Sequence, residues 1–124
     1  MFRLIKILGG RINVPEPEKY LAGAEIKDGM SLVLSGGKVS PAKTKPTHIA
    51  IGNAKNGEKV ACYAVTPEMI FEVACTAAPA AEGSLVTINT DYLKVTATTT
   101  DGVATVVSKN GATKAGDKIL VKFA

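Results

Sequence analysis

Short apolar runs, separated by turn-forming residues, follow one another along most of the chain. In residues 92–98 apolar and polar side chains alternate, so that Leu93, Val95 and Ala97 would share one face, as is typical of a half-buried strand. Residues 118–123 alternate in the same way and predict a strand with Ile119, Val121 and Phe123 on one face. The other expected strands comprise residues 30–34, 38–40, 47–52, 60–65, 69–74, 84–88 and 103–107.

The residues between these runs favour tight turns. Gly36 and Gly37 separate two of the runs and predict a hairpin, because glycine readily adopts the positive φ that such turns require. A bridge rich in alanine around Pro79 allows one helical turn at most. We therefore expect an all-β protein, a small barrel or sandwich of about nine to ten short strands with no helix longer than about two turns.

The first twenty residues predict an extended N-terminal arm, followed by a single β domain over residues 21–124. Pro15 and Pro17 exclude a helix over the end of this arm, and Gly9 and Gly10 end its apolar start. The start either pairs back onto the domain as an edge strand or docks on a neighbouring subunit or another protein. The second alternative makes this end of the arm a candidate partner-binding segment, with Phe2, Arg3, Leu4, Ile5, Lys6, Ile7 and Arg11 as its residues.

A weak internal repeat relates the two halves of the chain. Residues 29–60 contain a Gly-x-x-Leu-Val segment and later a Gly-Glu-Lys-Val segment, and residues 83–119 contain Gly-x-Leu-Val followed by Gly-Asp-Lys-Ile. In each copy a glycine permits a turn, an acid and a lysine stay in solvent, and an apolar strand follows. The repeat predicts a recurring turn and strand, and it does not call for any particular chemistry.

The basic character of the chain does not by itself indicate a nucleic-acid partner. The formal net charge is +4 at pH 7, and the positive charge is spread over the whole sequence. The densest basic stretch, around Lys38, Lys43 and Lys45, contains two prolines and is typical of a solvated loop. Phosphate binding requires several cations acting together, so we do not expect a nucleic-acid partner, and a nucleic-acid-binding β-barrel is the second hypothesis.

Nothing in the sequence predicts an enzyme, a metal site or a cofactor. His48 is the only histidine, and its place between strand residues is typical of a hydrogen-bonded histidine at a strand end. Cys62 and Cys75 lie in apolar runs without CxxC spacing, which favours free buried thiols and leaves a disulfide as the alternative. The acids stand next to glycine, proline or lysine in expected turns. The apolar start of the chain is too short for a signal peptide or a membrane span, so we expect synthesis in a cytoplasm.

Several segments resemble the small capsid decoration proteins, also called cement proteins, of tailed phages and prophages. They are residues 6–18, 45–53, 57–63, 67–72 and 115–123, which are spread over nearly the whole chain. The resemblance implies a β-rich, non-enzymatic protein that binds the major capsid protein, stabilises the assembled head against internal pressure and often works as a trimer at symmetric positions. It also implies a location in the host cytoplasm during synthesis and on the surface of the virion head afterwards.

Overall fold

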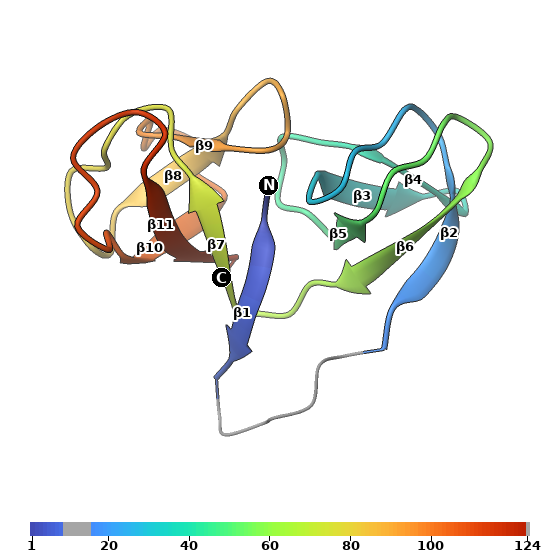
Figure 1. Ribbon diagram of the computed structural model, residues 1–124, viewed down its shortest axis with the longest axis horizontal. Coiled ribbons are helices and arrows are strands. Elements are labelled where there is room, and N and C mark those ends of the chain that lie inside the picture. The colour runs from blue at the N-terminus through green and yellow to red at the C-terminus, as the bar shows by residue number, and fades with distance from the viewer. Residues whose placement is uncertain (9–15, 124) are drawn as a thin grey trace.

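The computed structural model describes residues 1–8 and 16–123 of the chain (Figure 1). These residues form eleven strands and no helix, which confirms the expected all-β fold class. The strands are β1 (Arg3–Ile7), β2 (Glu18–Ala22), β3 (Ser31–Ser35), β4 (Lys38–Pro41), β5 (His48–Ile51), β6 (Lys59–Ala64), β7 (Met69–Ala74), β8 (Leu85–Ile88), β9 (Val95–Thr96), β10 (Ala104–Ser108) and β11 (Lys118–Lys122).

The first unit of the fold is a closed barrel of five strands. Its strands follow one another around the barrel in the order β2-β4-β3-β5-β6, and β2 also pairs with β6. The expected hairpin joins β3 to β4, with φ of 60° at Gly36 and 80° at Gly37. Inward-facing side chains fill the barrel with a core that consists of Ala22, Ile26, Met30, Leu32, Val39, Ala50, Ala54, Val60 and Cys62.

The second unit is built from β7 to β11 and receives β1 as an additional strand. The order in its sheet is β1-β7-β11-β10-β8-β9. A parallel bridge between Cys75 and Val95 links β9 back to the end of β7. As expected, Ile119, Val121 and Phe123 all face the core, where each is at most 1% exposed. The rings of Phe2 and Phe71 pack on Phe123 from two sides, with centroids 5.4 and 5.5 Å away.

The internal repeat corresponds to the same pattern of strand pairing in both units. In the first unit β6 pairs antiparallel with β2 and β5, while β3 pairs antiparallel with β4 and β5. In the second unit β11 pairs antiparallel with β7 and β10, and β8 with β9 and β10. The remaining contact is parallel in both cases: β2 with β4, and Cys75 with Val95. Strands β2 to β6 therefore correspond in order to β7 to β11.

The register of the repeat agrees residue by residue at the turn before the last strand of each unit. The Gly57 amide donates to the carbonyl of Ala22 over 2.9 Å, and the Gly116 amide donates to that of Cys75 over 2.8 Å. Both glycines have a φ of 89°. In each turn an acid, Glu58 or Asp117, accepts a hydrogen bond from the amide three residues before it. Two stretches of different sequence thus fold into the same capped turn.

Two strand predictions differ from the structure. The alternating residues 92–98 form only the two-residue strand β9, because Tyr92 has a φ of 61° and the side chain of Asp91 accepts a hydrogen bond from the Leu93 amide. The resulting turn delays the strand until Val95. Conversely, β2 begins at Glu18, inside the segment expected to be an extended arm, and the domain boundary drawn at residue 20 lies within this strand. The alanine-rich bridge forms turns and bends rather than a helical turn.

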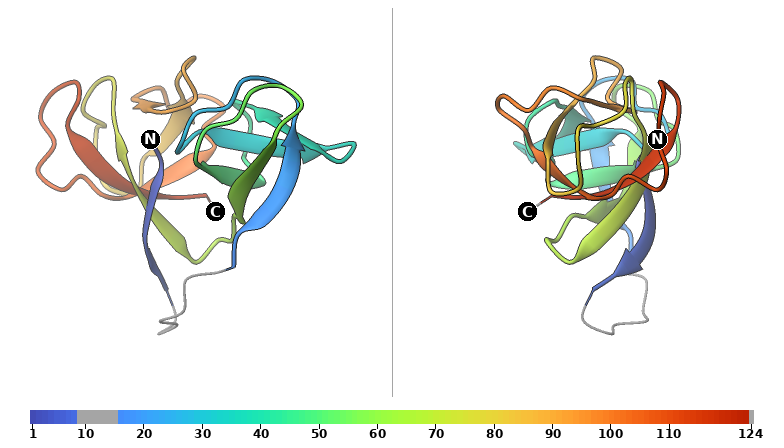
Figure 2. Two further views of the ribbon diagram at one scale, coloured as in Figure 1. Left: turned by 45° about the vertical axis from the view of Figure 1, so that its right-hand side comes forward. Right: turned by 90° about the vertical axis from the view of Figure 1, so that its left-hand side faces the viewer.

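The two units lie side by side (Figure 2), and a few residues contact both of them. Ile49 of β5 belongs to the core of the second unit, and Tyr92 packs against the cores of both units. The Ser31 amide donates to the carbonyl of Tyr92 over 3.1 Å. Strand β1 connects the units as well, because the Phe2 amide donates to Gly29 of the first unit while the Phe2 ring is buried in the second.

Candidate protein-binding edge

Strand β1 forms one edge of the sheet in the second unit. It pairs antiparallel with β7, with Arg3 opposite Glu72 and Ile7 opposite Met69, so the start of the chain is an edge strand of its own domain. Within the part of the chain that the structure describes, no strand pairs with the other side of β1. Unpaired amides and carbonyls along such an edge can accept a strand from another protein.

A register shift between Leu4 and Lys6 gives β1 an irregular edge. Such a bulge places one extra residue, here Ile5, on the longer side of the pair. The Ile5 side chain is 42% exposed, as is that of Leu8, although both are large and apolar. Arg3 and Lys6 are exposed as well. The outer side of β1 therefore combines apolar contact surface with two positive charges.

Six of the seven residues predicted to bind a partner fall into three groups. Arg3, Ile5 and Lys6 are exposed, whereas Leu4 and Ile7 are half-buried and pack against the core of the second unit. Phe2 is only 3% exposed and belongs to that core, so its side chain anchors β1 to the second unit. Arg11 lies outside the described residues. The residues available to a partner on this strand are therefore Arg3, Ile5 and Lys6.

The single histidine takes part in a hydrogen-bond network at one end of the first unit. His48 is buried, its Nε2 lies 2.9 Å from Glu18 Oε1, and its Nδ1 lies 2.8 Å from Thr47 Oγ1. The Leu34 amide donates to the same Thr47 oxygen, which leaves the hydroxyl proton for Nδ1, so the Nε2–H tautomer satisfies every partner. This arrangement matches the expected hydrogen-bonded histidine.

Glu18 holds this network together from β2. Its Oε1 also accepts a hydrogen bond from the Tyr20 hydroxyl over 2.8 Å, and the Tyr20 ring lies edge-on to the imidazole of His48. The hydrogen bonds from His48 and from Tyr20 lower the pKa of the Glu18 carboxyl below its usual value, and the bond to Glu18 raises the pKa of Tyr20. The cluster ties β2 to β5 and closes this end of the barrel.

Both cysteines are free and buried, as expected, and the structure contains no disulfide between them. Cys62 lies inside the first unit, where burial raises the pKa of its thiol to about 11. Burial likewise raises the pKa of the Cys75 thiol, whose sulfur lies 3.2 Å from the carbonyl of Asp117. A thiol with a raised pKa contains little thiolate near neutral pH, so both residues behave as core side chains.

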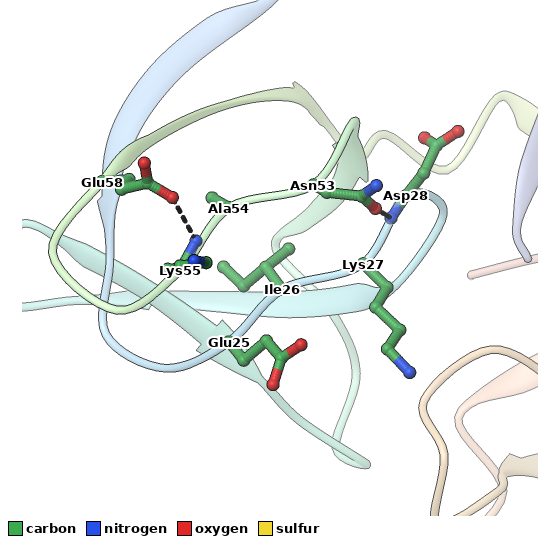
Figure 3. A pocket seen from close by; sticks show the side chains of 8 residues that line it. All are labelled: Glu25, Ile26, Lys27, Asp28, Asn53, Ala54, Lys55 and Glu58. Carbon is green, nitrogen blue, oxygen red and sulfur yellow. Dashed lines mark hydrogen bonds between the residues drawn. The ribbon is translucent and has the colours of Figure 1, made fainter.

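One hollow of the first unit is lined by turn residues (Figure 3). Its volume is about 420 Å³, and its polar groups are largely occupied by local hydrogen bonds. Asn53 accepts from the Asp28 amide, Asp28 from the Gly52 amide and Glu58 from the Lys55 amide. These acids are turn-capping residues, as their sequence positions predicted. Among the described residues no three histidine, cysteine or acidic side chains gather in a way that could hold a metal ion.

No known protein-family model matches the chain, and no curated protein matches it either. The resemblance to capsid decoration proteins therefore remains a prediction from the sequence. Across the described residues the structure offers no helix of the length and apolarity that membrane crossing requires. The free edge of β1 is the feature from which a binding function can be proposed.

Proposed function

We propose that this protein is a non-enzymatic structural protein of a phage or prophage head, which binds the assembled capsid through the free edge of β1 and stabilises it. The observation that carries the proposal is an edge strand whose outer side exposes Ile5 between Arg3 and Lys6. An edge of this kind binds an extended strand through main-chain hydrogen bonds, while its side chains select the partner. The major capsid protein is the proposed partner.

The way β1 is anchored favours this function. Phe2 is buried against Phe123, and the Leu8 amide donates to the carbonyl of Glu68 over 2.8 Å, so both ends of the strand are fixed to the second unit. A strand that is already ordered loses little conformational entropy when it binds. Many copies bound to one lattice, as homo-oligomers and in the proposed arrangement as trimers, would turn weak single contacts into strong attachment. In this proposal the protein moves from the host cytoplasm to the surface of the head.

Co-sedimentation with undecorated heads tests the proposal. The heads would come from the phage or prophage whose genes flank this one, and the purified protein is expected to sediment with them. The variant Ile5→Asp places a charge on the free edge and should weaken binding about tenfold or more. Leu85→Asp is the matched control, because Leu85 is equally exposed, at 43%, but lies on β8. Absence of co-sedimentation over a range of salt concentrations, or equal loss in both variants, would contradict the proposal.

A basic β-barrel that binds nucleic acid is the second candidate, and the aromatic residues favour it less. Binding of single strands relies on exposed aromatic rings on which bases can stack. All three phenylalanines are at most 3% exposed, and the three tyrosines are partly buried. A salt-dependent mobility shift of a labelled oligonucleotide would support this candidate over the capsid.

A further inference from the structure

The outer face of the first unit gathers three lysines around one exposed leucine. In the β2–β6 pair Leu21 lies opposite Lys59, and in the β2–β4 pair it lies opposite Lys38. Residues directly opposite each other on neighbouring strands point to the same face, with Cβ atoms about 5 Å apart. Lys19 joins them, since it is two positions before Leu21 on the same strand. We call these four residues the lysine patch.

Burial confirms that the lysine patch faces solvent. Its three lysines are exposed and Leu21 is 39% exposed, whereas the alternating neighbours Ala22, Val39 and Val60 are at most 3% exposed and fill the barrel. Among the described residues none of the three lysines forms an ion pair. Lys38 and Lys59 flank Leu21 on the two neighbouring strands, so an anionic partner bound over Leu21 would be attracted by all three positive charges.

The second unit contains the same positions and neutralises them. By the register of the repeat, Lys38 and Lys59 correspond to Lys94 and Lys118. Lys118 pairs with Glu72 over 3.8 Å, and Lys94 pairs with Asp91 over 3.8 Å.

Two differences leave the first unit without these carboxylates. The position of Glu72 is taken by Lys19. Asp91 lies in the connection between β8 and β9, and the Gly36-Gly37 turn between β3 and β4 has no residue that corresponds to it. Leu21 stands where the second unit has the small residue Ala74. The uncompensated charge is thus specific to one of two otherwise equivalent faces.

We infer that the lysine patch is a second binding surface, and that its partner is an acidic protein segment with an apolar side chain between its carboxylates. The three lysines match several carboxylates, and Leu21 offers the apolar contact at their centre. A nucleic-acid backbone would use the charges but would leave Leu21 without an apolar counterpart. This surface lies on the first unit, whereas the free edge of β1 belongs to the second, so the two proposals stand or fall separately.

Binding of a short acidic peptide to the full-length protein tests the inference. The probe is a blocked pentapeptide with a central leucine between two pairs of glutamates, and a second peptide carries glutamine in place of each glutamate. Addition of the acidic peptide to the ¹⁵N-labelled protein should shift the amide resonances of Leu21, Lys19, Lys38 and Lys59, and binding should weaken as salt is raised. The glutamine peptide should leave these resonances unchanged.

Two triple variants with the same change of charge serve as test and control. Lys19→Gln with Lys38→Gln and Lys59→Gln should weaken peptide binding about tenfold or more. Lys43→Gln with Lys45→Gln and Lys55→Gln removes three other exposed lysines and should leave binding within about twofold. All six side chains are exposed, so both variants should keep the fold, which urea unfolding can verify.

Three results would overturn the inference. The first is absence of peptide-induced shifts at the patch in low salt, and the second is an equal loss of binding in both triple variants. The third is a single-stranded oligothymidine that shifts the patch resonances while the acidic peptide does not, which would assign the surface to nucleic acid instead.

Discussion

The two units share one topology, but different groups contact the start of their first strand, which is β2 in the first unit and β7 in the second. In the second unit β1 pairs with the first half of β7, and Leu4 lies opposite the buried Phe71. In the first unit Glu18 occupies the position of Phe71, and it is hydrogen-bonded to His48 and Tyr20. One unit therefore uses an added strand and an aromatic core, and the other uses a small polar network.

The residue before Glu18 helps to explain why none of the described strands is added to the first unit there. Pro17 corresponds to Ile70, which pairs with Lys6 of β1. Proline has no amide proton to donate to a neighbouring strand, and natural proteins use it to protect sheet edges from unwanted pairing. The comparison teaches that two units with the same strand pairing can differ at their sheet edges through a few residues.

The largest expected effect comes from removing the aromatic anchor of β1. Phe2→Ala should lower the free energy of unfolding by about 3–5 kcal/mol, because the ring is buried against Phe123 and its loss leaves a cavity in the second unit. Urea unfolding followed by circular dichroism measures the effect. Ile5→Ala on the same strand is the control, and its effect should stay within about 0.5 kcal/mol because this residue is 42% exposed and lies outside the core.

A loss below about 1 kcal/mol for Phe2→Ala would break the comparison, since β1 would then not be an integral strand of the second unit. The same variant also bears on the proposed function. If Phe2 anchors the binding edge, the variant should bind heads more weakly than Ile5→Ala does under conditions where both remain folded.

A smaller effect tests the equivalence of the two units at their shared turn. Gly57→Ala and Gly116→Ala should each cost about 1–2 kcal/mol, because both glycines have a φ of 89°, which an L-residue adopts only with strain. A Cβ at either position would meet no atom within 4 Å, so the backbone alone determines the cost. Urea unfolding of the two variants should give equal losses within about 0.5 kcal/mol. A clear difference between the two losses would show that the turns share their geometry but not their contribution to stability.

The sequence predicted the parts of the fold that depend on local pattern. The alternation in residues 118–123 correctly placed Ile119, Val121 and Phe123 in the core, and the Gly36-Gly37 pair correctly predicted a hairpin. Residues 92–98 differ from the prediction because Tyr92 has a positive φ in a turn and its carbonyl accepts a hydrogen bond from the Ser31 amide of the other unit. A tertiary contact of this kind does not change the alternation of apolar and polar residues in the sequence, so the pattern cannot reveal it.

The binding surfaces were predictable only in part. The sequence indicated the start of the chain as a binding segment but could not separate the buried Phe2 from the exposed Ile5, because the bulge depends on the pairing with β7. The sequence does not indicate the lysine patch, because its three lysines lie 19 to 40 positions apart along the chain and come together only through the pairing of β2 with β4 and β6. The signal that could have revealed it is the repeat, which aligns Lys59 with Lys118.

The smallest expected effect concerns acid stability and distinguishes the capping acids of the two shared turns. Asp117 accepts hydrogen bonds from the amides of Thr113 and Lys114, and these bonds, first of all the one from Thr113, lower the pKa of its carboxyl below the usual value. Within the described part of the chain, Glu58 accepts one such bond, from the Lys55 amide. A carboxyl with a lowered folded pKa contributes stability above its unfolded pKa and loses it as the pH falls through the folded value.

Asp117→Asn should therefore unfold with a shallower dependence on pH than the wild type below about pH 4, while the two proteins stay parallel above about pH 5. Glu18→Gln should reduce the acid dependence in the same direction, since hydrogen bonds from His48 and Tyr20 also lower the pKa of Glu18. Urea midpoints measured between about pH 6 and about pH 2.5 give the slopes, with Glu82→Gln, at an exposed turn position, as the control. If the urea midpoints of Asp117→Asn and of the wild type had the same pH dependence throughout the acid range, the Asp117 carboxylate would not stabilise the turn. The two turns would then differ in sequence alone.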